Sequence, residues 1–347
     1  MFAISKKLSM SNEIKIEESQ YEFITDGFIR PVAPVRRFSQ GSNRFYYRIE
    51  PSGEITLFSS GTTLIRDGYA ESEFALEEWR NKLKADGKDP VYELAYAAMR
   101  GTLLHILAGD FIQQKEVTLG NLHAYFATNH PDTTTQAYYL EVIIRDTLWL
   151  QKGLLAFAQF VKDFNVKPLA IELILTSEKY GVASPVDMIC TMDIEEKGFF
   201  GEVYKSGENK GKPKESKKVR TIFAIVDFKS SKAFYDKHAL QLKLYKQMAS
   251  ECYPDLKIEG LYNWSPKDWT GETPSYNLKE QSGGKLEDIS DVVFQQGAIK
   301  HQWKTPTVNI VPDSISFGKD FSFTQVPLKQ FLKERHGENR DNNESSK

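Results

Sequence analysis

A carboxylate and an amine lie two residues apart at the end of an apolar segment, where Asp227 and Lys229 close the run 221–229. Short apolar runs rich in β-branched residues are typical of buried strands. Side chains alternate between the two faces of a strand, so Asp227 and Lys229 share one face and Phe228 points away. Their Cα atoms are then roughly 6.6 Å apart. At that spacing the carboxylate can hold a metal ion while the ammonium meets a phosphate, which is the chemistry of a metal-dependent nuclease. The alternative is a solvated ion pair at a strand end, because Asp-x-Lys also occurs by chance.

A second carboxylate, Asp187, lies in the apolar segment 185–192. Residues 169–175 form another apolar run, and together the two segments predict a hairpin whose loop includes residues 177–181. An unpaired carboxylate beside an apolar strand is costly. Two such carboxylates facing one cleft repel each other unless a cation lies between them, so we expect Asp187 and Asp227 to share a cation. A surface position near a turn is the alternative for Asp187.

Two predicted helices add further candidates. Residues 238–248 have helical spacing, and Gln241 and Tyr245, four residues apart, share one face. They could orient Lys229 or hold a DNA phosphate, although Tyr245 could equally be an ordinary core aromatic residue.

An earlier helix is predicted to begin at Pro90, after the N-cap residue Asp89. Gly101 and His105 lie four residues apart on one side of this helix. A glycine inside a helix costs ~1 kcal/mol relative to alanine and therefore usually marks a close approach of another segment. We expect His105 to be a metal ligand beside the strand carboxylates, with a packed or solvated histidine as the alternative.

The order of these motifs, Gly-x-x-x-His, Val-Asp, Asp-x-Lys and Gln-x-x-x-Tyr, resembles that of the RecB-type nucleases of the PD-(D/E)XK superfamily. The resemblance covers residues 59–264 approximately. The hairpin predicted at residues 45–49 and 55–58, followed by a Ser/Thr-rich helix start, is similar to the entry segment of several exonucleases of this group. The resemblance implies an α/β fold with a restriction-endonuclease-like mixed central sheet flanked by helices, extended by an N-terminal hairpin and extra helices. One departure is that Gly181 lies six residues before Asp187, where the family often has Gly-x-x-Asp.

The resemblance also implies a role for each candidate. Asp187, Asp227 and His105 would be metal ligands, together with the backbone carbonyl of Phe228. Lys229 would position or activate the attacking water and stabilise charge on the phosphate. The remaining residues, which would support the site, are Gln241, Tyr245 and Glu172. Oxygen ligands suit Mg²⁺ or Mn²⁺, and a histidine ligand shifts the preference toward Mn²⁺.

Composition excludes several classes of protein. The chain has 347 residues, of which 40% are hydrophobic, and a formal net charge of −2. It contains no apolar run of the ~18 residues that read as a membrane span, and no secretory signal is expected in residues 1–14. Two cysteines, Cys190 and Cys252, predict reduced thiols in the cytoplasm and cannot supply the four ligands of an iron–sulfur cluster.

One segment is strongly basic. Residues 205–220 contain seven basic and two acidic residues, a net charge of +5, and lie between the strands of Asp187 and Asp227. We expect them to form the tip of a long hairpin that contacts DNA, because binding follows local rather than total charge. A solvated loop is the alternative.

The predicted organisation has three parts: an N-terminal extension (residues 1–44), a nuclease domain (45–334) and a disordered tail (335–347). The domain would contain a helical insertion (115–165) and the basic hairpin (197–220). These features predict a DNA nuclease that depends on Mg²⁺ or Mn²⁺, an exonuclease by the resemblance of its entry segment, with DNA as partner and a homo-oligomer or a recombination protein as a further partner. Recombination, repair and phage genome processing all fit. The alternatives are a structure-specific endonuclease and a non-catalytic DNA-binding or recombination scaffold.

Overall fold

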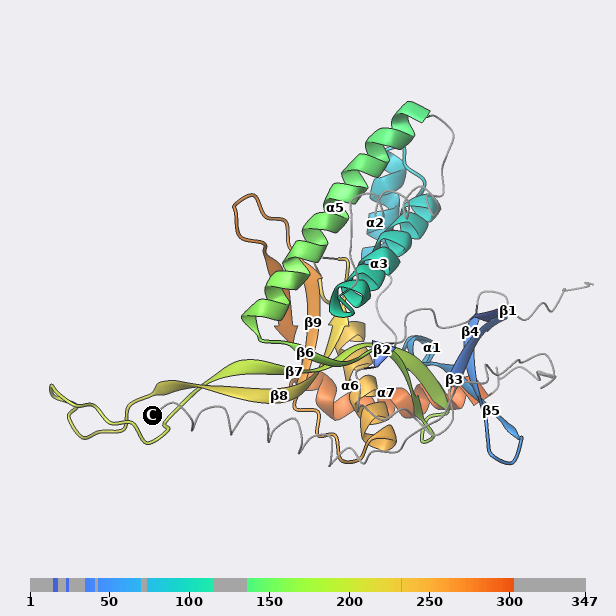
Figure 1. Cartoon of the computed structure of the whole chain (residues 1–347). Helices are drawn as coiled ribbons and strands as arrows, with labels where there is room; N and C mark the ends of the chain where they lie inside the picture. The colour runs from blue at the N-terminus through green and yellow to red at the C-terminus, as the bar shows by residue number, and fades with distance from the viewer. Residues whose placement is uncertain are drawn as a thin grey trace, which may run out of the picture.

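The computed structural model describes residues 15–17, 23–24, 35–40, 43–69, 74–114, 136–231 and 233–302. These residues form a mixed sheet with helices on both faces (Figure 1). The strands are β1 (Lys15–Glu17), β2 (Phe23–Ile24), β3 (Val35–Gln40), β4 (Asn43–Ile49), β5 (Ile55–Ser60), β6 (Lys167–Ser177), β7 (Val182–Gly198), β8 (Ser216–Phe228), β9 (Gly260–Pro266) and β10 (Tyr276–Glu280). The helices are α1 (Gly61–Gly68), α2 (Phe74–Ala85), α3 (Pro90–Ile112), α5 (Gln136–Asp163), α6 (Asp236–Cys252) and α7 (Lys285–Gln302).

The sheet has the strand order β1-β3-β4-β5-β7-β8-β9-β10, and β6 pairs with both β7 and β2. The pairs β5–β7 and β8–β9 are parallel, whereas β6–β7 and β7–β8 are antiparallel. The connection from β8 to its parallel neighbour β9 runs through α6, as a crossover between parallel strands requires. The predicted α/β architecture with a mixed sheet and flanking helices is therefore confirmed.

Two hydrophobic cores cover the two faces of the sheet. Residues of α1, α6 and α7 pack on one face, in a core that includes Leu244, Tyr245 and Phe294. Residues of α3 and α5 pack on the other face around Phe157, Phe160 and Trp264. Figure 1 shows α2, α3 and α5 on one side of the sheet and α6 and α7 on the other. This arrangement places the helix of His105 and the helix of Gln241 on opposite faces of the strands that carry the carboxylates.

Strands of the predicted N-terminal extension (residues 1–44) pair with the sheet. Strand β3 pairs with β4 from Val35↔Arg48 to Gln40↔Asn43, and β1 pairs with β3. Strand β2 pairs with β6. The sheet therefore begins within the predicted extension, because the hydrogen-bonding edge of β4 is satisfied by residues before position 45. The hairpin of β4 and β5 itself is present as predicted.

Strands β7 and β8 form a long hairpin whose pairing continues to Gly198↔Ser216. The hairpin projects away from the helices (Figure 1). We call residues 197–220 the arm, which matches the predicted basic hairpin. Of the predicted helical insertion, residues 136–163 form α5, whereas residues 115–135 and the tail 335–347 lie outside the described residues. Among the helices of the described part of the chain, none has the length and apolar character needed to cross a membrane.

Candidate active site

Two acidic residues of the β6–β7 hairpin, Glu172 and Asp187, lie where the alternation of side chains between the two sheet faces is interrupted. Ile171 and Met188 are paired and lie in the core against α3 and α5. Leu173 and Val186 are also paired, but they lie in the core against α1 and α6. Residues two apart on a regular strand share a face, so the faces change at the intervening residues, which are Glu172 and Asp187.

The backbone shows the cause of this change. Glu172 has φ of +52°, the left-handed region that non-glycine residues rarely adopt inside a strand. Such strained residues persist where the surrounding structure holds them, and they concentrate at functional sites. The twist at Glu172 turns its carboxylate toward Asp187 and α3.

His105 of α3 meets both carboxylates. Its Nδ1 lies 3.2 Å from Glu172 Oε1 and 3.7 Å from Asp187 Oδ1. Its Nε2 lies 3.0 Å from the carbonyl oxygen of Phe228. A carbonyl oxygen only accepts hydrogen bonds, so Nε2 carries a proton and donates it. This bond fixes the ring with Nδ1 facing the carboxylates.

Gly101 permits this approach of α3. A Cβ atom at position 101 would lie 3.3 Å from Ser230 Oγ, closer than ordinary contact. Ser230 follows Lys229 directly, so a larger residue at position 101 would press on the end of β8. The close approach expected from a glycine inside this helix is confirmed. Its start is as predicted too, because the side chain of Asp89 accepts a hydrogen bond from Val91 N.

Asp227 and Lys229 share one face of β8, as predicted. Lys229 Nζ donates to Asp227 Oδ1 at 2.9 Å and to Gln241 Oε1 at 3.1 Å. Gln241 Nε2 in turn donates to the hydroxyl of Tyr245, which also shares a hydrogen bond with Ser184. Gln241 and Tyr245 therefore hold the lysine from α6. The Phe228 side chain lies in the opposite core, while its backbone N–H donates to Asp187 Oδ2 at 2.6 Å.

Asn263 of β9 completes the surroundings of Asp227 and was not singled out from the sequence. Its side chain is fully buried, and its Nδ2 donates to Asp227 Oδ2 at 2.6 Å. Gln281 Nε2 donates to Asn263 Oδ1 at 3.0 Å. An asparagine within the apolar segment Gly260–Trp264 is the signal that could have identified it, because a buried amide needs a polar partner.

The charges at the site shift the pKa values of these groups. Burial raises the pKa of Asp227 to about 6, and the charge of Asp187 adds to this effect against the opposing charge of Lys229. Burial and the charge of Glu172 likewise raise the pKa of Asp187. Burial alone would lower the pKa of His105, but Asp187 and Glu172 outweigh it and raise the pKa to about 9. The carboxylates thus hold the imidazole protonated, which indicates a site that favours a cation.

The donor set fits a divalent cation. Within the described residues, ligand atoms of His105, Glu172 and Asp187 all lie within 4.8 Å of one another. Carboxylate oxygens with one imidazole suit Mn²⁺ and, less strongly, Mg²⁺. As a ligand, His105 Nδ1 would give up its proton, while Nε2 keeps its bond to a backbone carbonyl, the usual second contact of a metal-binding histidine.

The structure brings together all the residues predicted for the site, and their roles stay predictions. Glu172, predicted only to support the site, is part of the closest cluster of ligand atoms. The Phe228 carbonyl, predicted as a ligand, accepts a hydrogen bond from His105. Asp227 lies beside the cluster, with both oxygens occupied by Lys229 and Asn263, so its role as a ligand stays a prediction.

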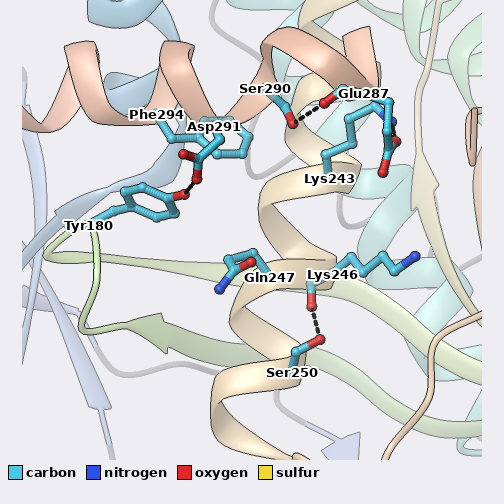
Figure 2. Close-up of a pocket in the computed structure, with 9 residues that line it drawn as sticks. All are labelled: Tyr180, Lys243, Lys246, Gln247, Ser250, Glu287, Ser290, Asp291 and Phe294. Carbon is cyan, nitrogen blue, oxygen red and sulfur yellow. Dashed lines mark hydrogen bonds and ion pairs between the residues drawn. The ribbon is translucent and has the colours of Figure 1, made fainter. Parts of the chain in front are cut away.

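A separate hollow of about 200 Å³ lies between α6 and α7 (Figure 2). Its lining residues Lys243, Lys246 and Gln247 lie on the face of α6 opposite Gln241 and Tyr245. Polar groups there pair with each other: Lys243 forms an ion pair with Glu287, and the Tyr180 hydroxyl donates a hydrogen bond to Asp291. This hollow is therefore separate from the candidate site.

No protein-family model matches the chain, and a search of curated protein sequences found no match.

Proposed function

We propose that this chain is a divalent-metal-dependent DNA nuclease with the restriction-endonuclease-like core of the RecB-type branch of the PD-(D/E)XK superfamily. One observation carries the proposal: His105, Glu172, Asp187, Asp227 and Lys229 come from distant parts of the chain and converge at one point. Three carboxylates gathered beside an ammonium and an imidazole have a large desolvation cost. A cation and a phosphate would balance these charges.

Each residue has a task in phosphodiester hydrolysis. A divalent ion at His105, Glu172 and Asp187 would supply an acidified water and neutralise phosphate charge. Lys229 directs its ammonium to the phosphate and to the attacking water, and Asp227 and Gln241 hold that ammonium in position. Preorganised charges of this kind stabilise the transition state without reorganising during the reaction. Asn263 keeps the Asp227 carboxylate oriented toward Lys229.

The order of the elements supports an exonuclease. The β4–β5 hairpin leads directly into α1 through Ser60, whose Oγ lies 2.8 Å from Thr62 Oγ1. This arrangement agrees with the entry segment on which the exonuclease resemblance rests. The complete set of Asp187, Asp227 and Lys229 favours an enzyme over a scaffold, since a scaffold has no need of all three.

The test uses purified full-length protein with Mg²⁺ or Mn²⁺ and two substrates of the same sequence, an end-labelled linear duplex and a closed circle. An exonuclease degrades the linear DNA and leaves the circle intact, and EDTA stops the reaction. Nicking of the circle, or cutting confined to branched DNA, would identify a structure-specific endonuclease. Binding of both DNAs with no cleavage in either metal would reject the nuclease proposal in favour of a scaffold.

A further inference from the structure

The tip of the arm is an ordered structure. Tyr204 N donates to Lys212 O at 3.1 Å, Gly211 N to Tyr204 O at 2.9 Å, and Lys214 N to Glu202 O at 2.7 Å. Val203 and Pro213 form a bridge between the two sides. The main chain therefore folds back as a second small hairpin beyond the paired ends of β7 and β8.

Apolar side chains at this tip are exposed. Phe199 is 70% exposed, Phe200 43%, Val203 48% and Tyr204 39%. The tip lies beyond the body of the protein (Figure 1), and the part of the chain that the structure describes leaves these side chains exposed. Exposed aromatic residues gathered in one place are typical of a surface that a partner covers.

The arm is also basic. Residues 197–220 include eight basic and three acidic residues. At the base of the arm, Lys217 pairs with Glu195, and Arg220 pairs with Glu196 and Glu259. The exposed lysines of the tip have no ion pair among the described residues; they are Lys205, Lys210, Lys212 and Lys214. The charge available to a partner is thus concentrated around the exposed rings.

A hairpin tip that combines exposed aromatic rings with exposed lysines matches one ligand well. Single-stranded nucleic acid offers phosphates to the ammonium groups and unstacked bases to the rings. Duplex DNA offers the same phosphates but keeps its bases stacked inside, so the rings would remain exposed to water. We propose that the arm binds single-stranded DNA, with Phe199, Phe200 and Tyr204 stacking on unpaired bases and the tip lysines contacting phosphates. The choice of DNA as the nucleic acid rests on the proposed function.

The first test measures binding in EDTA, so that cleavage plays no part. Full-length protein is titrated against a labelled oligothymidylate, an abasic strand of the same length, and a duplex. The variant Phe199→Ala with Phe200→Ala should bind oligothymidylate more weakly by roughly 5- to 150-fold per stacked base. Its affinity for the abasic strand should stay unchanged, because that strand has phosphates but no bases. Val219→Ala, which removes a 61% exposed apolar side chain of the arm without a ring, serves as the matched control.

The second test concerns the lysines. Replacing Lys205, Lys210, Lys212 and Lys214 by glutamine should lower the slope of log affinity against log salt, for both the abasic and the normal strand. The expected decrease is roughly 0.7 for each phosphate that a lysine no longer neutralises. Lys84→Gln on α2 is the control and should leave the slope unchanged. All these positions are exposed, so circular dichroism and urea unfolding should match the wild type.

Equal weakening for normal and abasic strands, or no weakening for either, would overturn the stacking proposal. A second result would also overturn the stacking proposal. If the wild type self-associates, and Phe199→Ala with Phe200→Ala abolishes this self-association without changing DNA binding, the rings contact a second copy of the chain instead. The two proposals fail separately. Base-dependent binding by the arm without cleavage in Mg²⁺ or Mn²⁺ would reject only the nuclease function, and cleavage with base-independent binding would reject only the arm.

Discussion

Exchanging Asn263 for aspartate tests the architecture of the site without removing any volume. Asn263 Nδ2 donates to Asp227 Oδ2 at 2.6 Å, and both side chains are fully buried. Aspartate has nearly the same shape, but it replaces this donor with an oxygen. Two carboxylates at that distance cannot both be ionised, so one must hold a proton in the folded protein.

The size of the effect follows from the cost of that proton. An aspartate with an ordinary pKa of ~3.9 costs about 1.36 kcal/mol per pH unit to keep protonated above that value. In the absence of metal, Asn263→Asp should therefore lower the free energy of unfolding by up to about 4 kcal/mol at pH 7. The loss should be smaller at pH 5, where the wild type also binds a proton at Asp227, whose pKa is about 6. The folded variant binds a proton that the unfolded chain releases, so its stability falls as the pH rises.

The assay is urea unfolding in EDTA at pH 5 and pH 7, compared with the wild type at each pH. Asn277→Asp is the matched control, because Asn277 Nδ2 bonds to the hydroxyl of Ser265 at 3.3 Å rather than to a carboxylate. The control should lose little stability and should show no recovery at pH 5. A loss for Asn263→Asp that is the same at both pH values, or no loss, would refute the contact between Asn263 and Asp227.

Three further predictions concern Lys229, His105 and His238. Lys229→Met should reduce the cleavage rate by ~10²-fold or more, the scale for one preorganised electrostatic group. Its affinities for DNA and for Mn²⁺ should stay near those of the wild type. A parallel loss of binding would contradict the role of Lys229 at the phosphate. His105→Ala should weaken Mn²⁺ binding in calorimetry and regain part of its activity in excess Mn²⁺, and unchanged Mn²⁺ affinity would exclude His105 as a ligand. Burial, together with the charges of Lys229 and Lys237, lowers the pKa of His238 to about 3, and its Nδ1 accepts a hydrogen bond from Tyr235 N at 3.2 Å. Since the unfolded chain binds this proton near pH 6.5, the free energy of unfolding should fall as the pH drops from about 6.5 toward 3, by up to ~1.4 kcal/mol per pH unit. Urea unfolding of the wild type should show this dependence on pH, and His238→Gln should lack it. Equal pH dependence of the two proteins would contradict a neutral, buried His238.

Local rules predicted the elements that carry the site. The Asp89 cap and Pro90 placed the start of α3, and the spacing of Gln241 and Tyr245 placed both on one face of α6. Alternation along β8 predicted that Asp227 and Lys229 face together, which their contact confirms. These properties depend on neighbours within a few residues and can be read from periodicity.

The parts that could not be predicted depend on contacts between distant segments. The left-handed backbone at Glu172 interrupts the alternation of a strand, and no composition signal near residue 172 requires it. For that reason Glu172 was assigned a supporting role although it faces His105 at 3.2 Å. Asn263 reaches Asp227 only because β9 lies parallel to β8. Likewise, strands β1 and β3 join the sheet through pairings that their short sequences do not specify.

The most direct test of the central claim compares cleavage by the wild type and by Asp187→Asn under single-turnover conditions. Asparagine can still accept the hydrogen bond from Phe228 N through its amide oxygen, and it removes the buried charge whose desolvation raises the pKa of Asp187. The variant should therefore fold and bind labelled linear DNA as the wild type does. We expect the wild type to cleave this DNA in Mn²⁺ and not in EDTA, and the variant to leave it intact in both. Cleavage by Asp187→Asn at the wild-type rate, or tight binding by the wild type without cleavage in either metal, would contradict the claim.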